Sequence, residues 1–235
     1  MNMDNGLPNA GLSKDSALKY FWPLVVFYVV FQLISDVTAG KVIQLGPAVV
    51  SVSVLYFPIT YIIADILTEV YGFARARRAL WLVMATSIIA GIIYQIVIAL
   101  PPGPGFTAND AYSTVFGAVP RILIGGWLAV FVGSYLNDFT MSKMKIWTKG
   151  RALWSRTIGS TVVGEGANTA IFYTIGLYGI LPTDILVSAI IWGWTIKVVV
   201  EVILTPITYV VVRKVKESER LDVYDVGENY TPLKF

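Results

Sequence analysis

Six long apolar runs alternate with polar segments along this chain. The runs cover residues 20–38, 48–70, 79–100, 121–141, 157–181 and 184–212. A helix of about 20 residues rises about 30 Å, which matches the hydrocarbon core of a bilayer. The pattern therefore predicts an all-α integral membrane protein whose residues 20–212 form a bundle of six transmembrane helices. Residues 1–19 are predicted to be a disordered tail, and residues 213–235 a frayed or peripheral one.

Local sequence features refine the prediction for three of these segments. Residues 37–39 resemble a signal-peptidase cleavage site, but the run before them is longer than the 7–15 apolar residues of a typical signal peptide. Pro58 lacks a backbone donor, so the second helix is predicted to kink or break near its start. The segment 101–120 is rich in Pro and Gly and predicts a loop with one helical turn at residues 110–116.

Basic residues gather in alternate polar segments. Two lie before the first run, three between the second and third, five between the fourth and fifth, and five after the sixth. Only Lys41 and Arg121 lie on the opposite side, and Lys197 falls inside the sixth run. Because cytoplasmic loops carry an excess of Lys and Arg, this asymmetry predicts that both termini are cytoplasmic. It also explains the basic loops without a nucleic-acid partner.

The composition agrees with a membrane protein and narrows the chemistry. The chain is 56% hydrophobic and 14% charged, whereas charged residues make up about 25% of a soluble domain. It has no cysteine and no histidine, which excludes disulfides, thiol nucleophiles, zinc sites of the His/Cys kind and Ser-His-Asp triads. We therefore expect neither an enzyme with catalytic residues, nor a cofactor, nor a metal site.

Two carboxylates interrupt the second apolar run. Asp65 and Glu69 are four residues apart, so a helix places both on one face, together with Tyr61 and Phe57. A charge at the centre of a transmembrane helix costs about 2.5–3.5 kcal/mol on insertion scales, so such a residue is by default a functional candidate. The alternative for Glu69 is a side chain at the membrane edge that pairs with one of the three arginines in segment 75–78.

Lys197 lies near the middle of the sixth run and needs an anionic partner there. Glu201 is available four residues later, and Glu165 and Asp65 are candidates from other helices. A structural interpretation is a buried ion network that holds the helices together. A functional interpretation is a polar chamber that binds a polar solute.

Other polar and aromatic residues share faces with these charges. Glu165, Asn168 and Phe172 share one face of the fifth run, where the small residues Ser160 and Gly164 favour close helix packing. The remaining polar residues within the runs include Gln32, Ser35, Asp36, Asn137 and Asp138. The predicted substrate-binding residues are Tyr61, Asp65, Glu165, Asn168, Phe172, Trp194 and Lys197. The residues predicted to serve in coupling or in a helix network are Glu69, Asp138 and Glu201.

Five segments carry a resemblance to a known family: FPITYIIADILTEVYG, ARRALW, VFGAVPRI, RTIGSTVVGEGANTAIF and KVVVEVILTPITY. Over residues 20–212 the chain resembles the queuosine-precursor transporter family, also called the vitamin uptake transporter family. The resemblance implies import of a 7-deazaguanine base, such as preQ0, preQ1 or queuine, across the bacterial inner membrane. Asn168 stands where the family often has Asp. Because Asn cannot titrate, the resemblance carries no proton-coupling role to this position.

The implied substrate agrees with the residues. A guanine-like base presents N–H donors that a carboxylate accepts side by side, so Asp65 or Glu165 is the expected acceptor. Tyr61 and Phe172 are the expected stacking partners. The main alternative is a membrane subunit that binds a vitamin or nucleobase for a separate ATPase module. An intramembrane enzyme and a purely structural protein are further alternatives. The expected partners are the base and the lipid bilayer, with a homo-oligomer left open.

Overall fold

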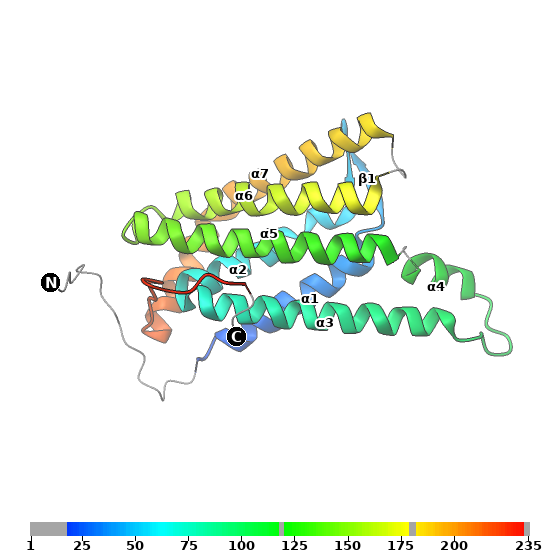
Figure 1. Cartoon of the computed structure of the whole chain (residues 1–235), viewed down its shortest axis with the longest axis horizontal. Coiled ribbons are helices and arrows are strands. Elements are labelled where there is room, and N and C mark those ends of the chain that lie inside the picture. The colour runs from blue at the N-terminus through cyan, green and yellow to red at the C-terminus, as the bar shows by residue number, and fades with distance from the viewer. Residues whose placement is uncertain (1–17, 118–119, 179–181, 233–235) are drawn as a thin grey trace.

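Helices dominate the computed structural model, which describes residues 18–117, 120–178 and 182–232. The helices are α1 (Phe21–Thr38), α2 (Pro58–Tyr71), α3 (Phe73–Ala99), α4 (Asn109–Phe116), α5 (Pro120–Trp147), α6 (Leu153–Phe172) and α7 (Thr183–Glu219). The other elements are β1 (Val42–Leu45), β2 (Ala48–Ser51), a 3-10 helix at Val52–Leu55 and a π-helical turn at Tyr173–Leu177. The long helices run along one axis, with the β1–β2 hairpin at one end and the C-terminal segment at the other (Figure 1). We call these the hairpin end and the tail end.

The prediction of a helix over residues 48–70 is wrong in its first part. Residues 48–55 form β2 and the 3-10 helix, residues 56–57 form a turn, and α2 begins only at Pro58. Proline suits the first turn of a helix, where a backbone N–H has no partner within the helix. Gly46 supplies a left-handed residue (φ +58°) to the hairpin turn, and the antiparallel register sets Val42 opposite Ser51. The fold is therefore not purely helical, and α2 has only 14 residues.

The other predicted runs correspond to helices with shifted ends. α3 and α5 each begin earlier or end later than the apolar runs, because charged turns extend them past the apolar residues. The helical turn predicted at residues 110–116 is confirmed as α4. The fifth run continues from α6 into a π-helical turn, and its last residues, 179–181, lie outside the described residues. Residues 1–17 of the predicted N-terminal tail also lie outside the described residues. Among the described helices, α1, α3 and α7 are each long and apolar enough to cross a membrane.

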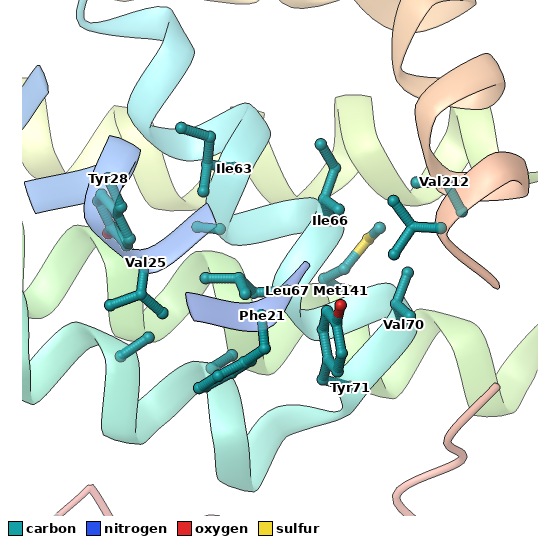
Figure 2. Close-up of a cluster of buried hydrophobic side chains, with 14 of the residues drawn as sticks. Phe21, Val25, Tyr28, Ile63, Ile66, Leu67, Val70, Tyr71, Met141 and Val212 are labelled. Carbon is teal, nitrogen blue, oxygen red and sulfur yellow. The ribbon is translucent and has the colours of Figure 1, made fainter. Parts of the chain in front are cut away.

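α2 lies in the middle of the bundle. All its residues except Ile59 and Ile62 are buried. At the tail end, its apolar side packs against α1, α5 and α7 in the cluster shown in Figure 2. The labelled members of this cluster are Phe21, Val25, Tyr28, Ile63, Ile66, Leu67, Val70, Tyr71, Met141 and Val212. Because α2 is surrounded by other helices, a charged side chain on it must find its partners inside the protein.

α5 and α6 approach each other closely at two glycines. A Cβ atom on Gly164 would lie 2.7 Å from the carbonyl oxygen of Gly133 and 2.7 Å from the Cβ of Asn137. The packing role predicted for Gly164 is therefore confirmed. This contact places Asn137 of α5 and Asn168 of α6 at the interface between the two helices.

The C-terminal segment, residues 220–232, packs back against the tail end. Both oxygens of Asp225 accept from the Phe73 backbone N–H, at 3.0 and 3.1 Å. Arg77 Nη1 donates to the Asn229 carbonyl at 2.8 Å. Burial raises the pKa of Asp225 above its ordinary value, although hydrogen bonds from the Ser142 hydroxyl and the Phe73 N–H oppose the rise. The sequence predicts a frayed or peripheral tail, whereas the described part of the segment closes over the start of α3.

Candidate functional site

A partly open cavity lies toward the hairpin end, between α1 and the hairpin on one side and α5, α6 and α7 on the other. Its empty space, including the open solvent at its mouth, is about 490 Å³. Its polar lining residues are Gln32, Ser35, Asp36, Ser51, Ser53, Asn168, Thr169 and Lys197. Its aromatic lining residues are Phe57, Phe172 and Tyr173. Polar groups and flat rings therefore face one partly open space.

Lys197 of α7 is anchored in the wall of this cavity by α6. Its Nζ donates to Glu165 Oε2 at 2.8 Å, to Asn168 Oδ1 at 3.0 Å and to Thr169 Oγ1 at 3.1 Å. The same nitrogen lies 4.7 Å from the centre of the Phe57 ring, a cation–π distance. A lysine has three N–H donors, so these contacts use all of them. Glu165 is thus the anionic partner that the sequence requires for Lys197.

The other two candidate partners of Lys197 make no ion pair with any described residue. Glu201 is fully buried, and neither carboxyl oxygen has a hydrogen-bond partner among the described residues. Asp65 is also fully buried; its Oδ1 accepts from Asn137 Nδ2 at 2.6 Å and from Ser160 Oγ at 3.3 Å. Its Oδ2 has no partner in the described part of the chain. We call Asp65 and Glu201 the inner acid pair.

Asp36 forms the acidic wall of the cavity. Gln32 Nε2 donates to Asp36 Oδ1 at 2.8 Å, and the Ser87 hydroxyl donates to Asp36 Oδ2. Trp127 Nε1 donates to Ser87 Oγ at 2.9 Å, which fixes this hydroxyl from the other side. The Gln32 Oε1 acceptor is buried without a partner among the described groups. The predicted site omits Gln32 and Asp36, although their shared face on the first run already grouped them.

The remaining predicted site residues are divided between the cavity and its surroundings. Lys197, Asn168 and Phe172 line the cavity, and Glu165 lies behind Lys197. Tyr61 lies outside the lining and donates its hydroxyl to the Lys197 carbonyl at 2.9 Å, which fastens α2 to α7. Trp194 is 36% exposed and donates to the Val162 carbonyl at 3.2 Å. The structure therefore brings three of the predicted residues together at the cavity and places Trp194 apart from it.

A second group of charges closes the tail end. Glu69 Oε1 lies 2.9 Å from Arg156 Nη2, 2.6 Å from Lys216 Nζ and 3.6 Å from Lys145 Nζ. Asp222 of the C-terminal segment lies 2.6 Å from Lys145 Nζ and 2.8 Å from Lys216 Nζ. We call these five residues the charge cluster. Burial pushes the pKa of Asp222 up, but the two ammonium groups outweigh this effect and hold it below its ordinary value.

The alternative partners proposed for Glu69 from the sequence are wrong. Arg77 bonds to the C-terminal segment instead, at 3.7 Å from Glu228 and 2.8 Å from the Asn229 carbonyl. Glu69 is only 1% exposed, so it lies inside the protein rather than at a wet edge. Its true partners come from α5, α6 and α7, which a pattern within one helix cannot reveal. The third predicted network residue, Asp138, is buried and accepts from Thr68 Oγ1 at 3.0 Å.

Comparison with known proteins gives one family and several relatives. A family model described as a putative vitamin uptake transporter matches residues 51–211. A Bacillus subtilis (strain 168) protein named "Probable queuosine precursor transporter" is 29% identical over 181 residues, which is 77% of this chain and 79% of the relative.

Two more relatives carry similar names. A Haemophilus influenzae protein, also named "Probable queuosine precursor transporter", is 23% identical over 124 residues, 53% of this chain and 50% of the relative. The Escherichia coli (strain K12) "Queuosine precursor transporter" is 21% identical over 152 residues, 63% of this chain and 66% of the relative. No solved structure matches this chain.

Proposed function

The chain belongs to the putative vitamin uptake transporter family, and on this ground we propose that it imports a queuosine precursor across the bacterial inner membrane. The substrate is a 7-deazaguanine-type base such as preQ0, preQ1 or queuine, in line with the names of the curated relatives. The alternative of a binding subunit for a separate ATPase module is not favoured, because each of these relatives is named as a transporter.

The cavity lining is the observation that supports this substrate class. A guanine-like base carries adjacent N–H donors and a carbonyl on one edge, and its rings are flat. Asp36 and the unpaired Gln32 Oε1 offer acceptors for the donors, and the amide nitrogen of Asn168 offers a donor for the carbonyl. Phe57 and Phe172 offer faces for stacking. The sequence predicts Asp65 or Glu165 as the acceptor; since neither lines the cavity, we propose Asp36.

The two ends of the bundle support transport by alternating access. The cavity lies toward the hairpin end and is partly open, whereas the charge cluster and the C-terminal segment close the tail end. We propose that the hairpin end faces outward, so that the structure represents an outward-facing state. Because most basic residues lie toward the tail end, this orientation agrees with the positive-inside rule.

In this topology the chain crosses the membrane six times and both termini are cytoplasmic. The second crossing is completed by α2, whose 14 residues rise only about 21 Å. The hairpin and the 3-10 helix that precede it line the cavity, where non-helical backbone is tolerated at membrane depth.

Cysteine labelling tests this topology directly, because the chain has no native cysteine. Trp147→Cys and Ser218→Cys at the tail end, and Thr107→Cys before α4, replace exposed residues. A membrane-impermeant maleimide applied to intact cells should label Thr107→Cys only, and all three variants after the membrane is opened. Labelling of Ser218→Cys in intact cells would overturn the proposed orientation.

Binding to purified protein tests the substrate and the role of Asp36. Wild type should bind a 7-deazaguanine base and discriminate against adenine, which presents a different edge. Charge-assisted hydrogen bonds contribute about 1.5–3 kcal/mol, so Asp36→Asn should weaken binding by about 10- to 150-fold. Asp110→Asn, an exposed acid at the start of α4, is the matched control and should bind like wild type. Equal binding by wild type and Asp36→Asn would exclude Asp36 as the acceptor.

A further inference from the structure

The interior around Lys197 holds more acids than cations. Glu165, Asp65 and Glu201 are all buried there, and Lys197 is their one neighbouring cation among the described residues. Its three donors are taken by Glu165, Asn168 and Thr169, so none reaches Glu201 although that residue is one turn away on α7. The inner acid pair therefore has no countercharge in contact with it.

Unpaired carboxylates are not stable as anions in such a place. Removing a carboxylate from water costs several kcal/mol, and without a cation or donors the group takes up a proton instead. Both Glu201 oxygens and Asp65 Oδ2 have no protein partner in the described chain, and the buried Asn137 Oδ1 and Thr161 Oγ1 have none either. These carboxyl oxygens therefore lack the donors that would stabilise an anion.

We propose that Asp65 and Glu201 form a proton-binding site that is loaded and emptied once in each transport cycle, so that import of the base is driven by protons. This inference rests on the proposed function and adds its driving force. The titratable groups that face the pair are Tyr28 of α1, Tyr61 of α2, Asp138 of α5 and Glu165 of α6. None of these four is a cation; Lys197 lies one turn before Glu201 on α7 and contacts Glu165.

Lys197 links the proton to the base. While Glu201 carries a proton, Lys197 stays with Glu165 and holds Asn168 and Thr169 in the cavity wall. When the proton leaves, the Glu201 anion attracts the ammonium across one helical turn, and the cavity wall is rearranged. Proton and base thus favour the same state. By linkage, each increases the affinity for the other, which is the requirement for symport.

Wild-type protein supplies the first test. Because proton and base favour the same state, wild type in weakly buffered solution should take up protons when a 7-deazaguanine base is added, measured with a pH-indicator dye. The affinity for the base should be about 5- to 150-fold higher when the pair is protonated than when it is not. Binding without proton uptake and with a pH-independent affinity would overturn the inference while leaving the proposed function intact. Absence of any base binding would instead contradict the proposed function.

Proteoliposomes supply the second test. Uptake of labelled base by wild type should accelerate when the outside is made acidic. Glu201→Gln, which mimics the protonated side chain, should lose this acceleration; its folding is checked by size-exclusion chromatography. Glu217→Gln, an exposed glutamate near the end of the same helix, is the matched control and should respond like wild type. A Glu201→Gln variant that still responds to the gradient would show that Glu201 does not carry the proton.

Discussion

Asp65 and Glu69 lie one turn apart on α2 and have opposite surroundings. Both are at most 1% exposed. Glu69 is in contact with three cations, Arg156, Lys216 and Lys145. Asp65 has a neutral amide and a hydroxyl as its only donors among the described residues, and one of its oxygens has none. Two carboxylates in equivalent positions of one helix thus have different roles available to them.

The difference arises from where the neighbouring helices carry their basic residues. Lys145, Arg156 and Lys216 stand near the tail-end termini of α5, α6 and α7, in the segments that the positive-inside rule predicts to be cytoplasmic. Basic residues on which the predicted orientation rests therefore also neutralise Glu69. One turn away, Asp65 contacts no cation among the described residues. Glu69, whose charge is neutralised by cations, is suited to holding the helices together at the tail end. Asp65, which contacts no described cation, is suited to exchanging a proton.

Glu69→Gln should have the largest effect. It leaves Arg156 and Lys145 buried without the carboxylate that both contact, and breaking a buried ion pair in this way typically costs about 3–5 kcal/mol. We expect a large loss of folded protein, measured as the monodisperse fraction in detergent and by the thermal unfolding midpoint.

The control for this variant is Glu217→Gln, which removes an exposed carboxylate of α7. It should unfold like wild type. If Glu69→Gln were equally stable, the charge cluster would not hold the tail end together, and the contrast between Glu69 and Asp65 would lose its structural basis.

The sequence predicts much of the bundle but only part of the site. Apolar length and the distribution of basic residues identify the long helices, because both follow from the bilayer and act locally. They fail at residues 48–57, where β2, the 3-10 helix and a turn are apolar yet not α-helical. Periodicity correctly requires a partner for Lys197 but cannot choose between Glu165 and Glu201. That choice depends on how close α6 lies to α7, and the residue spacing within one helix gives no information on the distance between two helices.

The same limit explains Asp36 and Trp194. Trp194 shares a helical face with Lys197 at i and i+3, yet its ring lies against Gly166 on the outside of α6. Asp36 is not among the predicted site residues and belongs to a different helix from each of them, but α1 brings it to the same cavity. Residues from separate helices form a site only through packing, and packing is fixed by contacts such as that between Gly133 and Gly164.

Gly164→Ala should have an intermediate effect. The added methyl group would lie within 3.0 Å of the Gly133 backbone and of Asn137, so α5 and α6 must separate. Overpacking of this kind typically costs about 1–3 kcal/mol, and it should also displace Asn137 from Asp65. Thermal unfolding measures the cost. Gly103→Ala, where the new Cβ would meet nothing within 4 Å, is the control. Equal unfolding midpoints would mean that the α5–α6 contact is loose enough to absorb a methyl group.

Asp65→Asn should have the smallest effect on stability, and it is the most direct test of the contrast within α2. The amide keeps an oxygen that can accept from Asn137 Nδ2, and no cation loses a partner. We therefore expect a change of less than about 1 kcal/mol in the free energy of unfolding, because only a neutral hydrogen-bonding group is altered. The unfolding midpoint of Asp65→Asn should lie close to that of wild type and well above that of Glu69→Gln. If the two variants were equally unstable, Asp65 would be an anion with a structural countercharge, and it could not act as an exchangeable proton site.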